Sequence, residues 1–184
     1  MSLELYSILL SIGLIALTGV VVGSFLLYFI APNVRRHILS HGYERYLAAI
    51  GLISFASILG ALLYQIGYLT PVCELCWWQR IFLFPIAIVA FVALWFKTRE
   101  AHITAAILAA FGLFYAVYHY YYHFQGLVLG NKLSLPCSSG GLLPACTDSP
   151  ILTFGFITIP FMGILVFSSI LILAFFAHKR AKAA

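Results

Sequence analysis

The chain has 184 residues, of which 64% are hydrophobic and 8% are charged, and its mean hydropathy is +1.07. A soluble domain carries about 25% charged residues, so this chain has too few to cover a water-facing surface. The formal net charge is +5, but the basic residues form short clusters between apolar stretches. That placement indicates membrane orientation, and we exclude nucleic acid as a partner.

Five apolar stretches are long enough, or nearly so, to cross a membrane, because about 20 helical residues span the hydrocarbon core. Backbone polar groups in lipid must be satisfied within their own segment, which predicts an α-helix for each stretch. In chain order the stretches are residues 5–31, 46–70, 77–96, 103–124 and 151–177. No basic region precedes the first stretch and no clear cleavage site follows it, so we expect it to be retained as a span.

The basic residues predict the orientation of these spans. They follow the first, third and fifth stretches, and the positive-inside rule places those connections in the cytoplasm. The opposite side carries no basic cluster. We therefore expect an all-α polytopic bundle of five spans with its N-terminus outside and its C-terminus inside. The basic residues of these three regions are Arg35, Arg36, Arg45, Lys97, Arg99, Lys179, Arg180 and Lys182.

Cys73 and Cys76 are separated by two residues at the outer start of the third stretch. This spacing serves a redox disulfide or half of a zinc site. Cys76 should lie near a helix N-terminus, with Arg80 one turn further on. The positive end of the helix dipole and the charge of Arg80 both favour a reactive thiolate at Cys76. These surroundings favour redox chemistry over a static disulfide or two inert thiols.

Arg80 itself needs a partner, because a cation near the hydrocarbon edge is costly when it is unpaired. A thiolate or a quinone carbonyl would serve. The alternative is that its side chain extends to the membrane surface.

Cys137 and Cys146 lie in the segment 125–150, which is rich in Gly, Pro and Ser and is predicted to be an outer loop. Its apolar residues between 127 and 135 are compatible with a short helix on the bilayer surface. An exposed disulfide is labile and can exchange with a second pair, although a disulfide that only orders the loop is also possible. Four cysteines allow three complete pairings, and the sequence does not choose among them.

The histidines suggest an alternative without catalysis. His119 and His123 share one helical face near the outer end of the fourth stretch. Together with Cys73 and Cys76 they would make a Cys2His2 zinc site. This reading leaves the second cysteine pair unexplained. Transport is a further alternative, but no span carries a buried carboxylate of the kind that marks ion paths.

The run from Cys73 to Arg80, Cys-Glu-Leu-Cys-Trp-Trp-Gln-Arg, resembles the signature of the disulfide bond formation protein B (DsbB) family, and most closely its Gram-positive BdbC-like branch. Residues 154–161 resemble the last span of that branch, and Gly112 and His119-Tyr120 its penultimate span. The resemblance covers about residues 46–177 and implies a four-helix membrane bundle. Residues 1–45 would then add an N-terminal span and a basic cytoplasmic loop to a thiol oxidase core at 46–184.

The resemblance implies an enzyme of the bacterial inner membrane that reoxidises a DsbA-like thioredoxin-fold oxidase on the extracytoplasmic side. It would pass the electrons to membrane quinone, either ubiquinone or menaquinone. Cys73 and Cys76 would form the pair nearest to the quinone. An enzyme of the vitamin K epoxide reductase type is the closest catalytic alternative, but there the loop pair precedes the Cys-x-x-Cys pair.

Individual roles follow from the same resemblance. Cys76 would face the quinone, Arg80 would bind or polarise it, and His119 would lie beside it. In the outer loop, Cys137 would be attacked by the partner's thiolate and Cys146 would complete the second disulfide.

Overall fold

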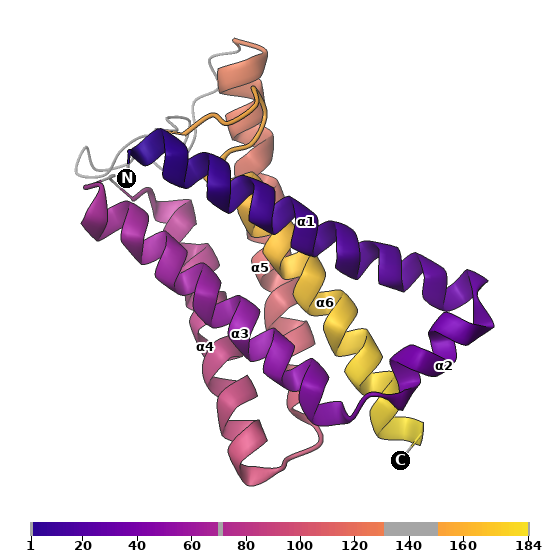
Figure 1. Ribbon diagram of the computed structural model, residues 1–184. Coiled ribbons are helices and arrows are strands. Elements are labelled where there is room, and N and C mark those ends of the chain that lie inside the picture. The colour runs from indigo at the N-terminus through magenta and orange to yellow at the C-terminus, as the bar shows by residue number, and fades with distance from the viewer. Residues whose placement is uncertain (1, 70–71, 131–150, 184) are drawn as a thin grey trace.

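The computed structural model describes residues 2–69, 72–130 and 151–183, most of which are helical (Figure 1). A short helix joins the first two long helices, and π-helical turns extend the second and fourth long helices. Among these described residues, five helices are long and apolar enough to cross a membrane, which confirms the predicted polytopic helical fold. The elements are α1 (Leu3–Ile30), α2 (Pro32–Ser40), α3 (Tyr43–Leu62), η1 (Leu63–Gly67), α4 (Glu74–Phe96), α5 (Ala101–His123), η2 (Phe124–Val128) and α6 (Ile159–Ala183).

The last long helix begins later than predicted. The apolar run from residue 151 was expected to be helical, but Thr153 and Ile157 instead form an isolated antiparallel bridge. Between them the chain turns through left-handed conformations, with φ of 55° at Phe154 and 80° at Gly155. A left-handed backbone cannot continue an α-helix, and α6 starts only at Ile159.

Two connections also differ from the prediction. The basic connection after α1 contains the short amphipathic helix α2, which begins with Pro32, a residue favoured in the first helical turn. At the other end, α5 continues as η2 to Val128, where a separate surface helix was considered. The rest of that segment, from residue 131 to 150, lies outside the described residues.

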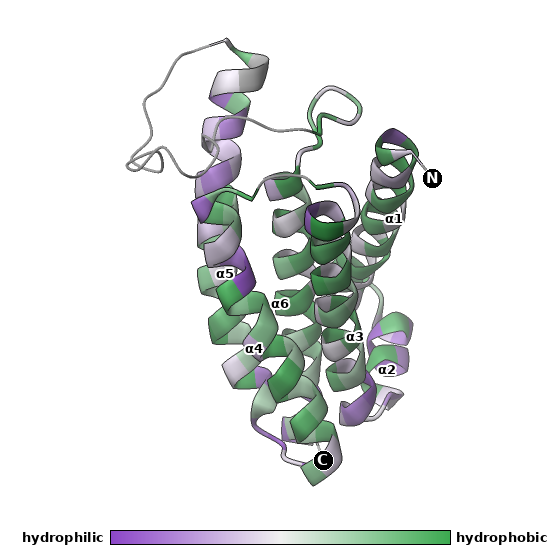
Figure 2. Cartoon of the chain, turned by 90° about the vertical axis from the view of Figure 1, so that its left-hand side faces the viewer, coloured by the Kyte–Doolittle hydropathy of each residue, from purple (hydrophilic) through white to green (hydrophobic). Residues whose placement is uncertain are grey.

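Alanine, glycine and serine are frequent among the large apolar side chains that fill the interior of the bundle. Helix α6 packs against α5, α3 and α1. Small residues allow membrane helices to approach closely. The closest approach is at Gly112 of α5, where an added Cβ would come within 2.3 Å of the ring of Phe167 in α6. The helices are hydrophobic along most of their length (Figure 2).

Helix α1 crosses α6 (Figure 1). Hydrogen bonds also connect α1 to the neighbouring helices. Near its outer end, the hydroxyl of Tyr6 donates to a carbonyl of α3 at 3.2 Å, and Tyr64 donates to the hydroxyl of Ser7 at 3.1 Å. Near its middle, Ser169 of α6 donates to Thr18 at 3.3 Å. Such hydrogen bonds stabilise helix association in lipid. The first span is therefore a packed part of the bundle.

Five crossings place the two termini at opposite ends (Figure 1). At the end that holds the C-terminus, His102 at the start of α5 contacts His178 of α6 at 3.1 Å and Tyr43 of α3 at 3.4 Å. The basic connections gather at this end. The start of α4, with Cys73 and Cys76, lies at the other end.

Candidate active site

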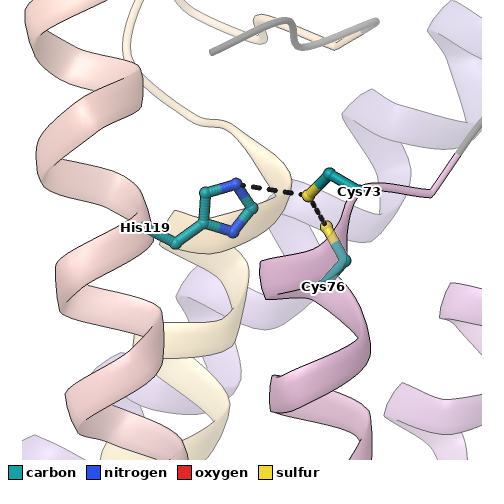
Figure 3. A group of neighbouring side chains, drawn as sticks. All are labelled: Cys73, Cys76 and His119. Carbon is teal, nitrogen blue, oxygen red and sulfur yellow. Dashed lines mark hydrogen bonds between the residues drawn. The ribbon is translucent and has the colours of Figure 1, made fainter. Parts of the chain in front are cut away.

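The first turn of α4 brings Cys73 and Cys76 together. Cys73 is the N-cap residue, with an extended backbone, and Cys76 follows within the first helical turn. Their sulfurs are 3.0 Å apart, about 1 Å more than the length of a disulfide bond (Figure 3). The sequence prediction placed Cys76 at a helix N-terminus, and the structure agrees. The positive end of the helix dipole favours a thiolate there.

His119 of α5 faces the first of these cysteines (Figure 3). Its side chain is fully buried, and its Nε2 lies 3.5 Å from the sulfur of Cys73. On the other side of the ring, Nε2 of Gln79 lies 3.1 Å from Nδ1. An amide nitrogen can only donate, so Nδ1 accepts and the neutral imidazole carries its proton on Nε2. His119 therefore presents an N–H to the sulfur of Cys73.

A glycine of α6 leaves room for Gln79. A Cβ at Gly163 would come within 2.5 Å of the Gln79 side-chain oxygen, so a larger residue would displace the amide. The glycine in α6 thus permits the contact between the amide of α4 and the imidazole of α5. Gln79 belongs to the motif from Cys73 to Arg80, and the sequence alone predicts no role for it. The signal was a polar side chain just inside an apolar span, where such groups bond across helices.

Arg80 is buried, and its guanidinium is held by groups of the second span. It donates to the side-chain oxygen of Gln65 and, at 3.1 Å, to the carbonyl oxygen of Ala61, while its carbon lies 5.3 Å from the Trp77 ring centre. Both of these hydrogen-bond acceptors are neutral oxygens, and neither is the thiolate or quinone carbonyl expected as a partner of Arg80. The alternative that the side chain extends to the membrane surface is wrong, because only 8% of Arg80 is exposed. Gln65, which had not been singled out, lies in the π-helical turn η1, and such turns are frequent at functional sites.

A cavity of about 530 Å³ lies between α1, α3, α4 and α6. Its walls are mostly apolar, and its polar lining includes Cys76, Gln79 and Arg80. Cys73 and His119 are not among the lining residues. The two cysteines therefore have different surroundings, since Cys76 opens on the cavity and Cys73 faces the imidazole. The expected position of His119 beside the quinone stays a prediction; the structure places its ring against Cys73.

The cavity fits a hydrophobic molecule with a polar head. Apolar side chains cover most of its surface, while Arg80, Gln79 and Cys76 give it a polar end. A membrane quinone combines a polar ring with an apolar tail, so the lining residues match its chemistry.

Three of the four residues that the sequence suggested as zinc ligands lie close together. The donor atoms of Cys73, Cys76 and His119 all lie within 4.8 Å of one another. The fourth, His123, packs edge-on against His119 with ring centres 4.5 Å apart and is not part of this group. A structural zinc site uses four protein ligands, so the described residues supply an incomplete set. Cys137 and Cys146 lie outside the described residues.

A comparison with protein-family models matches residues 43–177 to the family described as Disulfide bond formation protein DsbB. A probable disulfide formation protein of Coxiella burnetii is 32% identical over 132 residues, which cover 70% of this chain and 86% of the relative. The disulfide bond formation protein C of Bacillus subtilis is 33% identical over 128 residues, which cover 69% of this chain and 88% of the relative.

A second Bacillus subtilis relative is the SPbeta prophage-derived disulfide bond formation protein B. It is 34% identical over 119 residues, which cover 64% of this chain and 75% of the relative. No solved structure matches the chain significantly. The Bacillus relatives agree with the branch expected from the cysteine motif. The chain therefore belongs to the DsbB family and is a multi-pass membrane protein of disulfide bond formation.

Proposed function

We propose that this protein reoxidises a DsbA-like thioredoxin-fold oxidase on the outer side of the bacterial cell membrane and delivers the electrons to membrane quinone. The observation that carries the proposal is the unequal placement of the two sulfurs. Cys76 opens on an apolar cavity beside Arg80, while Cys73 faces a histidine. A pair placed in this way can exchange with thiols through one sulfur and pass electrons into the cavity through the other.

The electrons enter through the outer loop. A thiolate of the reduced partner attacks the Cys137–Cys146 disulfide, and resolution of the mixed disulfide leaves the partner oxidised and the loop pair reduced. The loop thiols then open the Cys73–Cys76 disulfide by a second exchange. Each exchange breaks one S–S bond and forms another, so two electrons and two protons move with the dithiol.

The residues of the bundle support the last step. The Nε2–H of His119 stabilises the thiolate formed at Cys73 when the disulfide opens. Arg80, fixed by Gln65, places positive charge beside the cavity and Cys76. Quinone is a two-electron acceptor that takes up two protons, which balances the oxidation of the dithiol. A DsbA-type oxidase has a reduction potential of about −120 mV, so its reoxidation requires such a strong acceptor.

The test is quinone reduction by the purified protein with two electron donors, a reduced thioredoxin-fold Cys-x-x-Cys protein and the small dithiol dithiothreitol. Cys76→Ser should abolish turnover with both donors, because no thiolate then faces the cavity. Cys137→Ser should abolish turnover with the protein donor and retain it with the small dithiol, which can reach the inner pair directly.

Normal turnover by Cys76→Ser would contradict the proposed path. So would a wild-type protein that reduces neither ubiquinone nor menaquinone. In the second case, metal analysis would separate the remaining alternative: stoichiometric zinc that is lost in Cys73→Ser would indicate that the three converging donors hold a metal.

A further inference from the structure

The first span has no counterpart in the family match, which begins at residue 43. Even so, α1 provides one wall of the cavity that contains Cys76. Its contribution is a stripe on one face of the helix, spaced three and four residues apart. The stripe consists of Leu9, Leu10, Gly13, Leu14 and Leu17.

This wall is held at both ends. Towards the outer end, the ring of Tyr6 packs edge-on against the ring of Tyr64, with ring centres 4.9 Å apart. The hydroxyl of Tyr64 also donates a hydrogen bond to Ser7. Below the stripe, Thr18 accepts the hydrogen bond from Ser169 of α6. The cavity occupies the space between these two attachments. The position of α1 over the cavity is therefore fixed by specific contacts.

The chemistry of the cavity changes along its length. Cys76, Gln79 and Arg80 belong to the first two turns of α4, close to the outer end. Deeper in the bundle, the lining from α3 and α6 is almost entirely apolar, as at Leu52 and Phe167. A ligand with its polar head at Cys76 would carry an apolar tail along the leucines of α1.

We infer that α1 forms the binding wall for the isoprenoid tail of the quinone and makes the enzyme selective for long-tailed quinones. The inference rests on the proposed function, because the head of the same molecule accepts electrons from Cys76. Gly13 lies in the middle of the wall, and a Cβ added there would meet no atom within 4 Å. A side chain at this position would project into the space assigned to the tail.

Gly13→Trp therefore tests the inference, with Gly19→Trp as the matched control. Gly19 is also a helical glycine of α1 with no atom within 4 Å of an added Cβ, but it does not line the cavity. The measurement is KM and kcat for a quinone with a long isoprenoid tail and for one without a tail. Gly13→Trp should raise KM for the long-tailed quinone roughly tenfold or more, the scale of a misfit in an apolar pocket.

The tailless quinone reports on folding in the same sample. Turnover of the tailless quinone by Gly13→Trp should fall much less than turnover of the long-tailed quinone, and Gly19→Trp should resemble wild type with both quinones. Gly13→Leu should show a smaller change in the same direction, and it takes over the test if the Trp variant does not fold.

Two results would overturn the inference. One is equal behaviour of the Gly13 and Gly19 variants with both quinones, which would mean that another lipid or no ligand occupies the cavity. The other is an equal loss with both quinones in a folded Gly13 variant. A wild-type protein that reduces neither quinone would instead contradict the proposed function, and this inference with it.

Discussion

At the scale of single residues, the reactive pair is controlled by a chain of contacts from three helices. Gly163 leaves room for Gln79, Gln79 donates to His119, and His119 presents its remaining N–H to Cys73. A donor at this distance stabilises the thiolate more than the disulfide, because only the thiolate carries a negative charge. These contacts should therefore raise the reduction potential of the Cys73–Cys76 pair.

Gln79→Leu should lower that potential. A net hydrogen-bond contribution of about 1 kcal/mol corresponds to about 20 mV for a two-electron couple. The measurement is equilibration with thiol redox buffers followed by alkylation of Cys73 and Cys76, in protein whose loop cysteines are replaced by serine. Ser57→Ala is the control, since Ser57 lines the cavity but bonds to a carbonyl of its own helix. An unchanged potential in Gln79→Leu would show that the imidazole does not influence the pair.

At the scale of helices, the bundle depends on positions where no side chain is tolerated. The ring of Phe167 is almost completely buried and lies over the backbone at Gly112, which lets α5 and α6 approach closely. In lipid the gain from this contact is van der Waals packing, because the hydrophobic effect does not favour one apolar neighbour over another.

Gly112→Ala should therefore destabilise the protein, although alanine is the better helix former. Overpacking of this kind costs about 1–3 kcal/mol and should lower the Tm in detergent. Phe167→Leu combined with Gly112→Ala should recover part of the loss, because the smaller side chain makes room for the new methyl group. Gly19→Ala, where an added Cβ meets nothing within 4 Å, should leave the Tm unchanged or slightly raised. Equal Tm values for the two alanine variants would contradict the packing argument.

At the scale of the whole molecule, the two ends of the bundle differ in charge and in chemistry. The connection between α4 and α5 lies at the end that holds the C-terminus, and α4 starts at the opposite end (Figure 1). The reactive cysteines belong to that start of α4. We propose that the basic end is cytoplasmic, in agreement with the positive-inside rule. The cysteines would then face the compartment in which disulfides persist.

Labelling of single cysteines in intact spheroplasts tests this orientation. A variant that retains only Cys137 should react with a membrane-impermeant maleimide without permeabilisation. A cysteine-free variant carrying Thr98→Cys, in the connection between α4 and α5, should react only after permeabilisation. The reverse pattern would place the active cysteines in the cytoplasm and exclude an extracytoplasmic partner.

The sequence by itself determined the features that depend on local pattern. Span number follows from the length of the apolar runs, and the closeness of Cys73 and Cys76 follows from their spacing over one helical turn. The family was recognisable from the run that ends at Arg80. The prediction of a helix from residue 151 was wrong, because hydropathy alone does not reveal the left-handed backbone at Gly155.

Only the tertiary structure decided which residues surround the reactive pair. His119 faces Cys73 and not the cavity, Arg80 bonds to Gln65, and α1 supplies a wall beside Cys76. The contact between Arg80 and Gln65 joins residues 15 positions apart, and the contact between Cys73 and His119 joins residues 46 positions apart. In each case the two residues belong to different helices. These contacts depend on how far each helix is rotated and shifted against its neighbours. That geometry is set by the small residues at the helix contacts, and no periodicity within one span encodes it.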